Sequence, residues 1–83
     1  MYKVFLKESA KKTLKKLDNS QRKTIIKKLR NLEKNPELGK PLLGNLKGFR
    51  SLRIEKFRVI YIFFQEKLII SVLEIGHRKN IYN

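Results

Sequence analysis

The spacing of hydrophobic residues changes once along this 83-residue chain, and the change restricts the folds that the chain can adopt. In the first 35 residues the apolar side chains recur at every third or fourth position, which is typical of helices that bury one face. From residue 49 onward they form dense runs of Phe, Tyr, Ile and Val, which are typical of strands. Helices followed by a block of strands predict an α+β fold.

The predicted element order is β-α-α-β-β-β, within a single domain of residues 1–83. A helical hairpin is expected to pack on a curved, mainly antiparallel sheet of four strands, with the N-terminal strand pairing at an edge. The strands are expected at residues 2–7, 49–56, 57–64 and 67–75. One helix begins at Glu8-Ser9, and the other lies between the turn cluster 18–20 and Asn35-Pro36. Two-residue turns are expected at Glu55-Lys56 and Gln65-Glu66.

The charge of the chain predicts an anionic partner. Lys and Arg number 21 and Asp and Glu only 7, which gives a formal net charge of +14. Such an excess favours nucleic acid, an acidic protein or an anionic membrane surface. In residues 1–35 the cations are mostly lysines at helical spacing, whereas arginines are enriched among the later strands. The lysine faces are either ordinary solvated surfaces or a face that holds RNA by charge alone.

Several classes of site are excluded or disfavoured. The chain has no Cys and one His, so a Cys-based zinc site and a disulfide framework are excluded. Its seven acidic residues are scattered, with no cluster suited to Mg²⁺ and no pair suited to glycoside hydrolysis. The start of the chain lacks the apolar run of a signal peptide, and no stretch reaches the length of a membrane span. We therefore expect a cytoplasmic protein without cofactor or metal.

The arginines of the strands are the first candidates for chemistry. Arg53 and Arg58 flank the expected turn and are predicted to share one face of the sheet. Two guanidinium groups side by side repel each other unless an anion lies between them, so the pair predicts a phosphate clamp. The alternative is an edge pair that Glu55 or Glu74 neutralises.

The C-terminal run of residues 76–82 supplies further candidates. Cationic neighbours such as Arg78 stabilise a phenolate and lower its pKa, which favours Tyr82 as a general base. The alternative is that Tyr82 only packs the end of the chain onto the sheet. Together these residue types suit RNA cleavage without a metal, in which the 2′-OH attacks the adjacent phosphorus and cations stabilise the developing charge.

Four segments resemble the RelE/ParE superfamily of toxins, the toxin halves of type II toxin–antitoxin modules. They are KPLLGNLKG at 40–48, LRI at 52–54, FRVIY at 57–61 and GHRKNIY at 76–82. The resemblance covers essentially the whole chain and is most specific in its C-terminal half. It implies a RelE-like fold and a ribosome-dependent mRNA endonuclease that cleaves A-site codons and inhibits translation.

The resemblance also implies roles for individual residues. The catalytic set would be Arg53, Arg58, Arg78 and Tyr82, and the RNA-binding set Lys47, Arg50, His77 and Lys79. Some relatives carry a lysine two residues before the Arg53 position, where this chain has Ser51. The identity of the general base is therefore left open, with Arg50, Lys47 and Tyr82 as the candidates.

The implied partners are the ribosome, mRNA and an acidic, RelB-like antitoxin that forms a heteromeric complex with the toxin. Two other functions remain open from the sequence. One is a ParE-like toxin that inhibits gyrase and cuts no RNA. The other is a module that binds RNA or the ribosome without catalysis, in which the arginines only hold phosphate.

Overall fold

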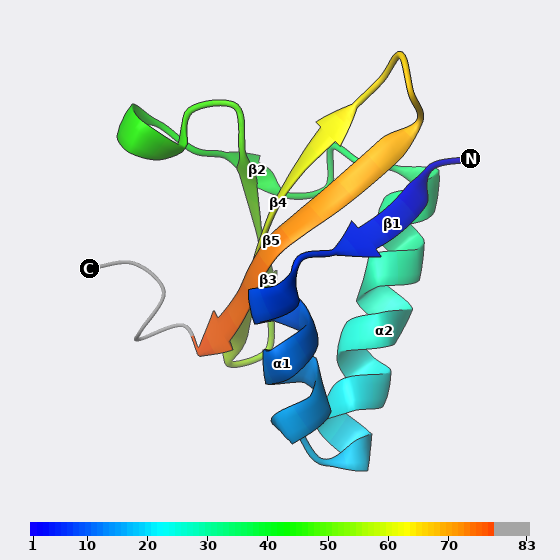
Figure 1. The fold of residues 1–83 in the computed structure, drawn as a ribbon, viewed down its shortest axis with the longest axis vertical. Helices are drawn as coiled ribbons and strands as arrows, with labels where there is room; N and C mark the ends of the chain where they lie inside the picture. The colour runs from blue at the N-terminus through cyan, green and yellow to red at the C-terminus, as the bar shows by residue number, and fades with distance from the viewer. Residues whose placement is uncertain (78–83) are drawn as a thin grey trace.

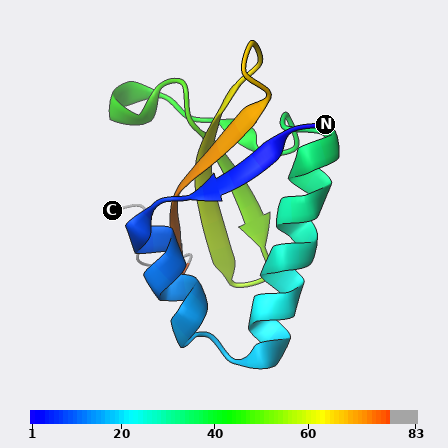
Figure 2. The same ribbon diagram turned by 45° about the vertical axis from the view of Figure 1, so that its right-hand side comes forward.

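The computed structural model describes residues 1–77, which form a mixed sheet with two helices packed on one of its faces (Figures 1 and 2). The helices are α1 (Glu8–Lys16) and α2 (Asn19–Lys34), and a short 3₁₀ turn, η1, spans Gly44–Leu46. The strands are β1 (Lys3–Leu6), β2 (Lys40–Pro41), β3 (Arg50–Ile54), β4 (Phe57–Phe64) and β5 (Ile69–His77). No helix in the described residues is both long and apolar enough to cross a membrane.

The sheet has the strand order β1-β5-β4-β3-β2. β1 runs parallel to β5, and the other neighbouring pairs are antiparallel. The predicted α+β architecture and the edge position of β1 are therefore confirmed. The expected number of four strands is corrected to five, because β2 pairs with the start of β3. A strand of two residues that includes a proline carries no detectable periodicity, so no sequence pattern indicates it.

The two hairpin turns differ from each other. The turn at Glu55-Lys56 has the predicted length, with Glu55 in the left-handed region at φ 53°. The predicted two-residue turn at Gln65-Glu66 is wrong, because β4 pairs Phe64 with Ile69 and leaves four residues in the loop. Within that loop only Leu68 takes a positive φ, of 54°.

The core lies between the helices and the sheet. Buried side chains from both helices and from the sheet contribute to it: Ala10, Ile25, Leu29, Leu32, Ile54, Phe57, Val59, Tyr61, Ile70, Val72 and Ile75. Because successive residues of a strand point to opposite faces, Phe57, Val59 and Tyr61 on β4 face the helices while Arg58 faces away from them. The face of the sheet opposite the helices therefore carries Arg58 and the apolar Ile60, which alternate with the core residues of β4.

Hydrogen bonds of Asp18 and Arg22 fix the hairpin between the helices. Asp18 caps α2 by accepting from the backbone N–H of Gln21 at 2.8 Å, and the side chain of Gln21 bonds back to Asp18. The guanidinium of Arg22, on α2, donates to carbonyl oxygens at the end of α1, including that of Leu17 at 2.7 Å and that of Leu14 at 3.2 Å. It thereby adds hydrogen bonds to the carbonyl groups at the C-terminal end of α1, where the regular helical pattern stops.

Replacing Arg22 with alanine should lower the free energy of unfolding by about 1.5–3 kcal/mol, because several charge-assisted hydrogen bonds to the last turn of α1 are lost. Urea unfolding followed by circular dichroism measures the loss. Lys23→Ala is the matched control, since Lys23 is the exposed neighbouring cation. Equal stability of the two variants would contradict a capping role for Arg22.

Candidate functional site

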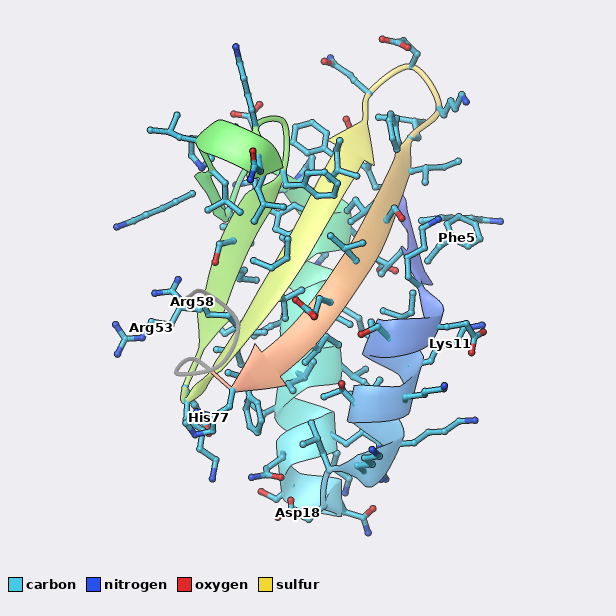
Figure 3. The ribbon with its side chains drawn as sticks, turned by 60° about the vertical axis from the view of Figure 1, so that its left-hand side comes forward. Phe5, Lys11, Asp18, Arg53, Arg58 and His77 are labelled. Atoms are coloured by element: carbon cyan, nitrogen blue, oxygen red, sulfur yellow. The ribbon has the colours of Figure 1, made fainter. Side chains whose placement is uncertain are left out.

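Arg53 and Arg58 lie opposite each other on β3 and β4. Residues that face each other across an antiparallel pair point to the same side of the sheet. Figure 3 shows both side chains projecting from the strands on the side away from the helices. The shared face expected from the sequence is thus observed. Neither Glu55 nor Glu74 is recorded in an ion pair with Arg53 within residues 1–77, so the alternative of a neutralised edge pair gains no support for Arg53.

The two arginines line a cavity of about 300 Å³ at the β2–β3 edge of the sheet. This hollow is called the cationic cavity below, and it is lined by Leu38, Lys40, Ser51, Leu52, Arg53 and Arg58. Three of these carry positive charge and, among the described residues, none of them is acidic. A hollow with three cations and an apolar wall suits a phosphate group with an attached sugar or base.

Ser51 fixes the guanidinium of Arg58. The Nη1 of Arg58 donates to the Oγ of Ser51 at 3.1 Å, and Ser51 is only 5% exposed. The bond holds the arginine along the sheet, toward the cavity that both residues line. A long side chain held in this way loses less conformational freedom when it binds an anion. The residue that replaces the lysine of some relatives therefore acts here on the neighbouring arginine.

Lys40 reaches the same face from β2. It lies directly opposite Ser51 in the β2–β3 pairing, so its side chain points to the side of Ser51, Arg53 and Arg58. In the sequence Lys40 stands out only as the first residue of the segment KPLLGNLKG, without a role of its own, and no local pattern there predicts a strand.

Tyr61 anchors the segment that leads into β2. Its buried hydroxyl donates to the carbonyl oxygen of Pro36 at 2.6 Å and accepts from the backbone N–H of Gly39 at 2.8 Å. Gly39 lies so close that a Cβ atom there would be 2.8 Å from the Oη of Tyr61 and 2.9 Å from the carbonyl oxygen of Ser51. The position of Lys40 is therefore set by contacts with the core of the molecule.

Arg50 belongs to this anchor and not to the cavity. Its Nη1 donates to the carbonyl oxygen of Gly39 at 2.7 Å, and its guanidinium lies 5.7 Å from the centre of the Phe63 ring. Arg53 lies three positions after Arg50 on one strand, so the two side chains point to opposite faces. The structure thus does not bring Arg50, expected to bind RNA, to the side of Arg53 and Arg58.

The other predicted residues are spread more widely. Lys47 is exposed in the loop after η1, beyond the opposite end of β3 from Arg53, and does not line the cavity. His77 ends β5 opposite Phe57 and contacts its ring edge-on, with ring centres 6.2 Å apart. Three further predicted residues, Arg78, Lys79 and Tyr82, lie outside the described residues.

Tyr61 should also make stability depend on pH. Burial raises the pKa of its phenol above 10.0, although the hydrogen bond from Gly39 and the charge of Arg50 oppose the shift. A raised pKa in the folded state stabilises the fold below the pKa of the unfolded chain, and this stabilisation is lost as pH rises through the folded pKa. Tyr61→Phe should cost about 1–3 kcal/mol at neutral pH, because it leaves the amide of Gly39 without its partner.

Urea unfolding of both proteins between pH 7 and pH 11 checks this prediction. The difference in stability between wild type and Tyr61→Phe should narrow above pH 10, where only the wild type loses the contribution of the phenol. Lysine titration affects both proteins and cancels in the difference. A difference that stays constant over the whole range would contradict the assigned cause.

Comparisons with known proteins agree on one family. The model of the ParE toxin of type II toxin–antitoxin systems, parDE, matches residues 4–82. A RelE-like toxin protein of Escherichia coli is 34% identical over 86 residues, which cover 99% of this chain and 90% of that relative. The toxin–antitoxin complex RelBE2 of Mycobacterium tuberculosis has 28% identity and a TM-score of 0.86, with 93% of this chain and 98% of that chain covered. A chain of the intact Escherichia coli RelBE complex shares the fold, with 23% identity and a TM-score of 0.80. That match covers 93% of this chain and 96% of that chain.

Proposed function

The chain belongs to the RelE/ParE superfamily of type II toxins, and from this we propose that it is a ribosome-dependent mRNA endonuclease that inhibits translation. The observation that carries the proposal is the cationic cavity, in which Arg58 is held by Ser51 opposite Arg53. A nuclease that uses the 2′-OH of its substrate needs a fixed site for the scissile phosphate. A toxin that works only by binding another protein needs no such hollow.

The proposed reaction follows from the cations. The 2′-oxygen of the nucleotide in the cavity attacks the adjacent phosphorus in line with the 5′-oxygen, and a base takes the 2′-OH proton. Arg58 and Arg53 stabilise the negative charge that develops on the phosphoryl oxygens. The bond from phosphorus to the 5′-oxygen then breaks, which leaves a 2′,3′-cyclic phosphate and a 5′-hydroxyl. Arg78 and Tyr82 remain predicted members of the same catalytic set.

Translation in a cell-free extract tests the proposal. The protein is made briefly with a reporter mRNA, and the 5′ ends of the RNA fragments are mapped. Cuts are expected inside codons that occupy the ribosomal A site, with 5′-hydroxyl ends, and none should appear when ribosomes are omitted. Intact mRNA in an extract where another toxin of this superfamily cuts would overturn the proposal.

Inhibition of gyrase is the second candidate function, because the matching family model is that of a ParE toxin. A supercoiling assay with purified gyrase distinguishes the two. Inhibition of supercoiling together with intact mRNA would favour the ParE-like activity. Loss of mRNA at toxin concentrations that leave supercoiling unchanged would favour the endonuclease.

The proposed partner outside the ribosome is an acidic antitoxin. The similar structures from Mycobacterium tuberculosis and Escherichia coli are both toxin–antitoxin complexes. The net charge of +14 suits a negatively charged partner as well as RNA. Because its substrate would be the mRNA on translating ribosomes, the proposed location of the protein is the cytoplasm.

A further inference from the structure

Lys40 shares the cationic cavity with Arg53 and Arg58, although only the two arginines were expected there. Two independent observations place it: the residue lines the cavity, and it lies opposite Ser51 in the strand pairing. Its side chain thus enters the cavity from β2, whereas the arginines enter from β3 and β4. A phosphate in the cavity would meet cations from three strands.

The three cations differ in one chemical property. A guanidinium does not give up its proton in proteins, whereas a lysine ammonium carries three protons and can release one. The hydroxyl of Ser51 accepts from Arg58, so that side chain is engaged in positioning. Among the cavity residues that the structure describes, Lys40 is therefore the one group suited to deliver a proton to a leaving oxygen.

The position of Lys40 is also unusually well fixed for an exposed residue of a two-residue strand. The preceding residue, Gly39, is held through its N–H by Tyr61 and through its carbonyl oxygen by Arg50. Both partners approach from the face of the sheet that packs on the helices, so the open face is left to the lysine side chain. A residue that only contributes charge to a surface would not need an anchor in the core.

We propose that Lys40 is a catalytic residue of this site, and that its ammonium group protonates the departing 5′-oxygen. This inference rests on the proposed RNA cleavage. In the step, the 2′-oxygen forms its bond to phosphorus and its proton passes to a solvent water. The bond from phosphorus to the 5′-oxygen breaks, and that oxygen takes a proton from the Nζ of Lys40. The neutral amine is reprotonated by solvent, so atoms and charge balance over one turnover.

The test compares Lys40→Arg with wild type on ribosomes programmed with two mRNAs. One mRNA is unmodified, and the other carries sulfur in place of the 5′-oxygen at the cut site. Arginine keeps the positive charge but does not release a proton, so kcat on the normal mRNA should fall about 10²–10⁴-fold with little change in KM. A thiolate leaves without protonation, so on the sulfur substrate the variant should be within about threefold of wild type.

Lys67→Arg, an exposed lysine in the β4–β5 turn, is the matched control and should leave both substrates unaffected. An equal loss for Lys40→Arg on both substrates would overturn the acid role, as would normal cleavage of the unmodified mRNA by this variant. A variant that raises KM alone would also overturn it. In these three cases the wild type still cuts, so the proposed function stands. If the wild type cuts neither mRNA, the proposed function and the role of Lys40 fail together.

Discussion

Replacing Arg58 with alanine should lower the rate of mRNA cleavage on ribosomes by about 10²–10³-fold, the usual loss for one positioned donor to a developing oxyanion. Arg58 is the cation of the cavity for which the structure records a hydrogen bond to the cavity wall, through Ser51. It is thus held before the substrate arrives, and its removal costs preorganised stabilisation. The effect should appear mainly in kcat, because the charge on the phosphoryl oxygens grows as the reaction proceeds.

Two further variants define what Arg58 contributes. Arg58→Lys keeps the charge but loses the planar donor set, so cleavage should fall between that of the wild type and that of the alanine variant. Lys67→Ala is the control for a lost cation outside the cavity and should cleave normally. Circular dichroism and urea unfolding should show that Arg58→Ala still folds, since the residue points away from the core. Cleavage by this folded variant at the wild-type rate would remove Arg58 from the mechanism.

Replacing Gly39 with alanine should destabilise the fold by about 1–3 kcal/mol, the usual cost of extra volume in a packed site. The new methyl group would lie 2.8 Å from the Tyr61 ring and hydroxyl and 2.9 Å from the carbonyl oxygen of Ser51. A buried ring and a strand backbone cannot move aside easily, so residue 39 should shift and lose its bond to Tyr61. Lys40 should then leave the cavity, and cleavage should fall together with stability.

A double-mutant cycle separates this clash from other effects of the alanine. Tyr61→Phe removes the Oη atom that the methyl group would meet, so the double variant should be more stable than the sum of the single losses predicts. Urea unfolding of the four proteins gives the coupling energy. Gly44→Ala serves as a comparison, because a Cβ there meets nothing within 4 Å although the φ of 65° is strained. Strict additivity in the cycle would show that the contact with the hydroxyl is not the cause, because the contacts with the ring and with the carbonyl oxygen of Ser51 remain in the Tyr61→Phe variant.

The arrangement of the arginines shows which side-chain positions can be predicted from local sequence patterns. Alternation along β3 and β4, with a short turn between them, is sufficient to place Arg53 and Arg58 on one face, and the structure agrees. The same alternation separates Arg50 from Arg53, since three positions along a strand change the face. The sequence contained that information, because counting positions along the strand is sufficient to place Arg50, which was expected to bind RNA, on the face opposite Arg53 and Arg58.

The sequence by itself determined the order of the two helices and of every strand except β2, and the opposed arginine pair. These features depend on residues close together in the chain, and hydrophobic spacing and turn chemistry encode them directly. Tertiary structure alone decided that residues 40–41 form a strand and that Lys40 enters the cavity. That outcome depends on Tyr61 meeting Pro36 and Gly39, which lie 25 and 22 positions away from it. Contacts of this kind form only when the core packs, so no local pattern records them.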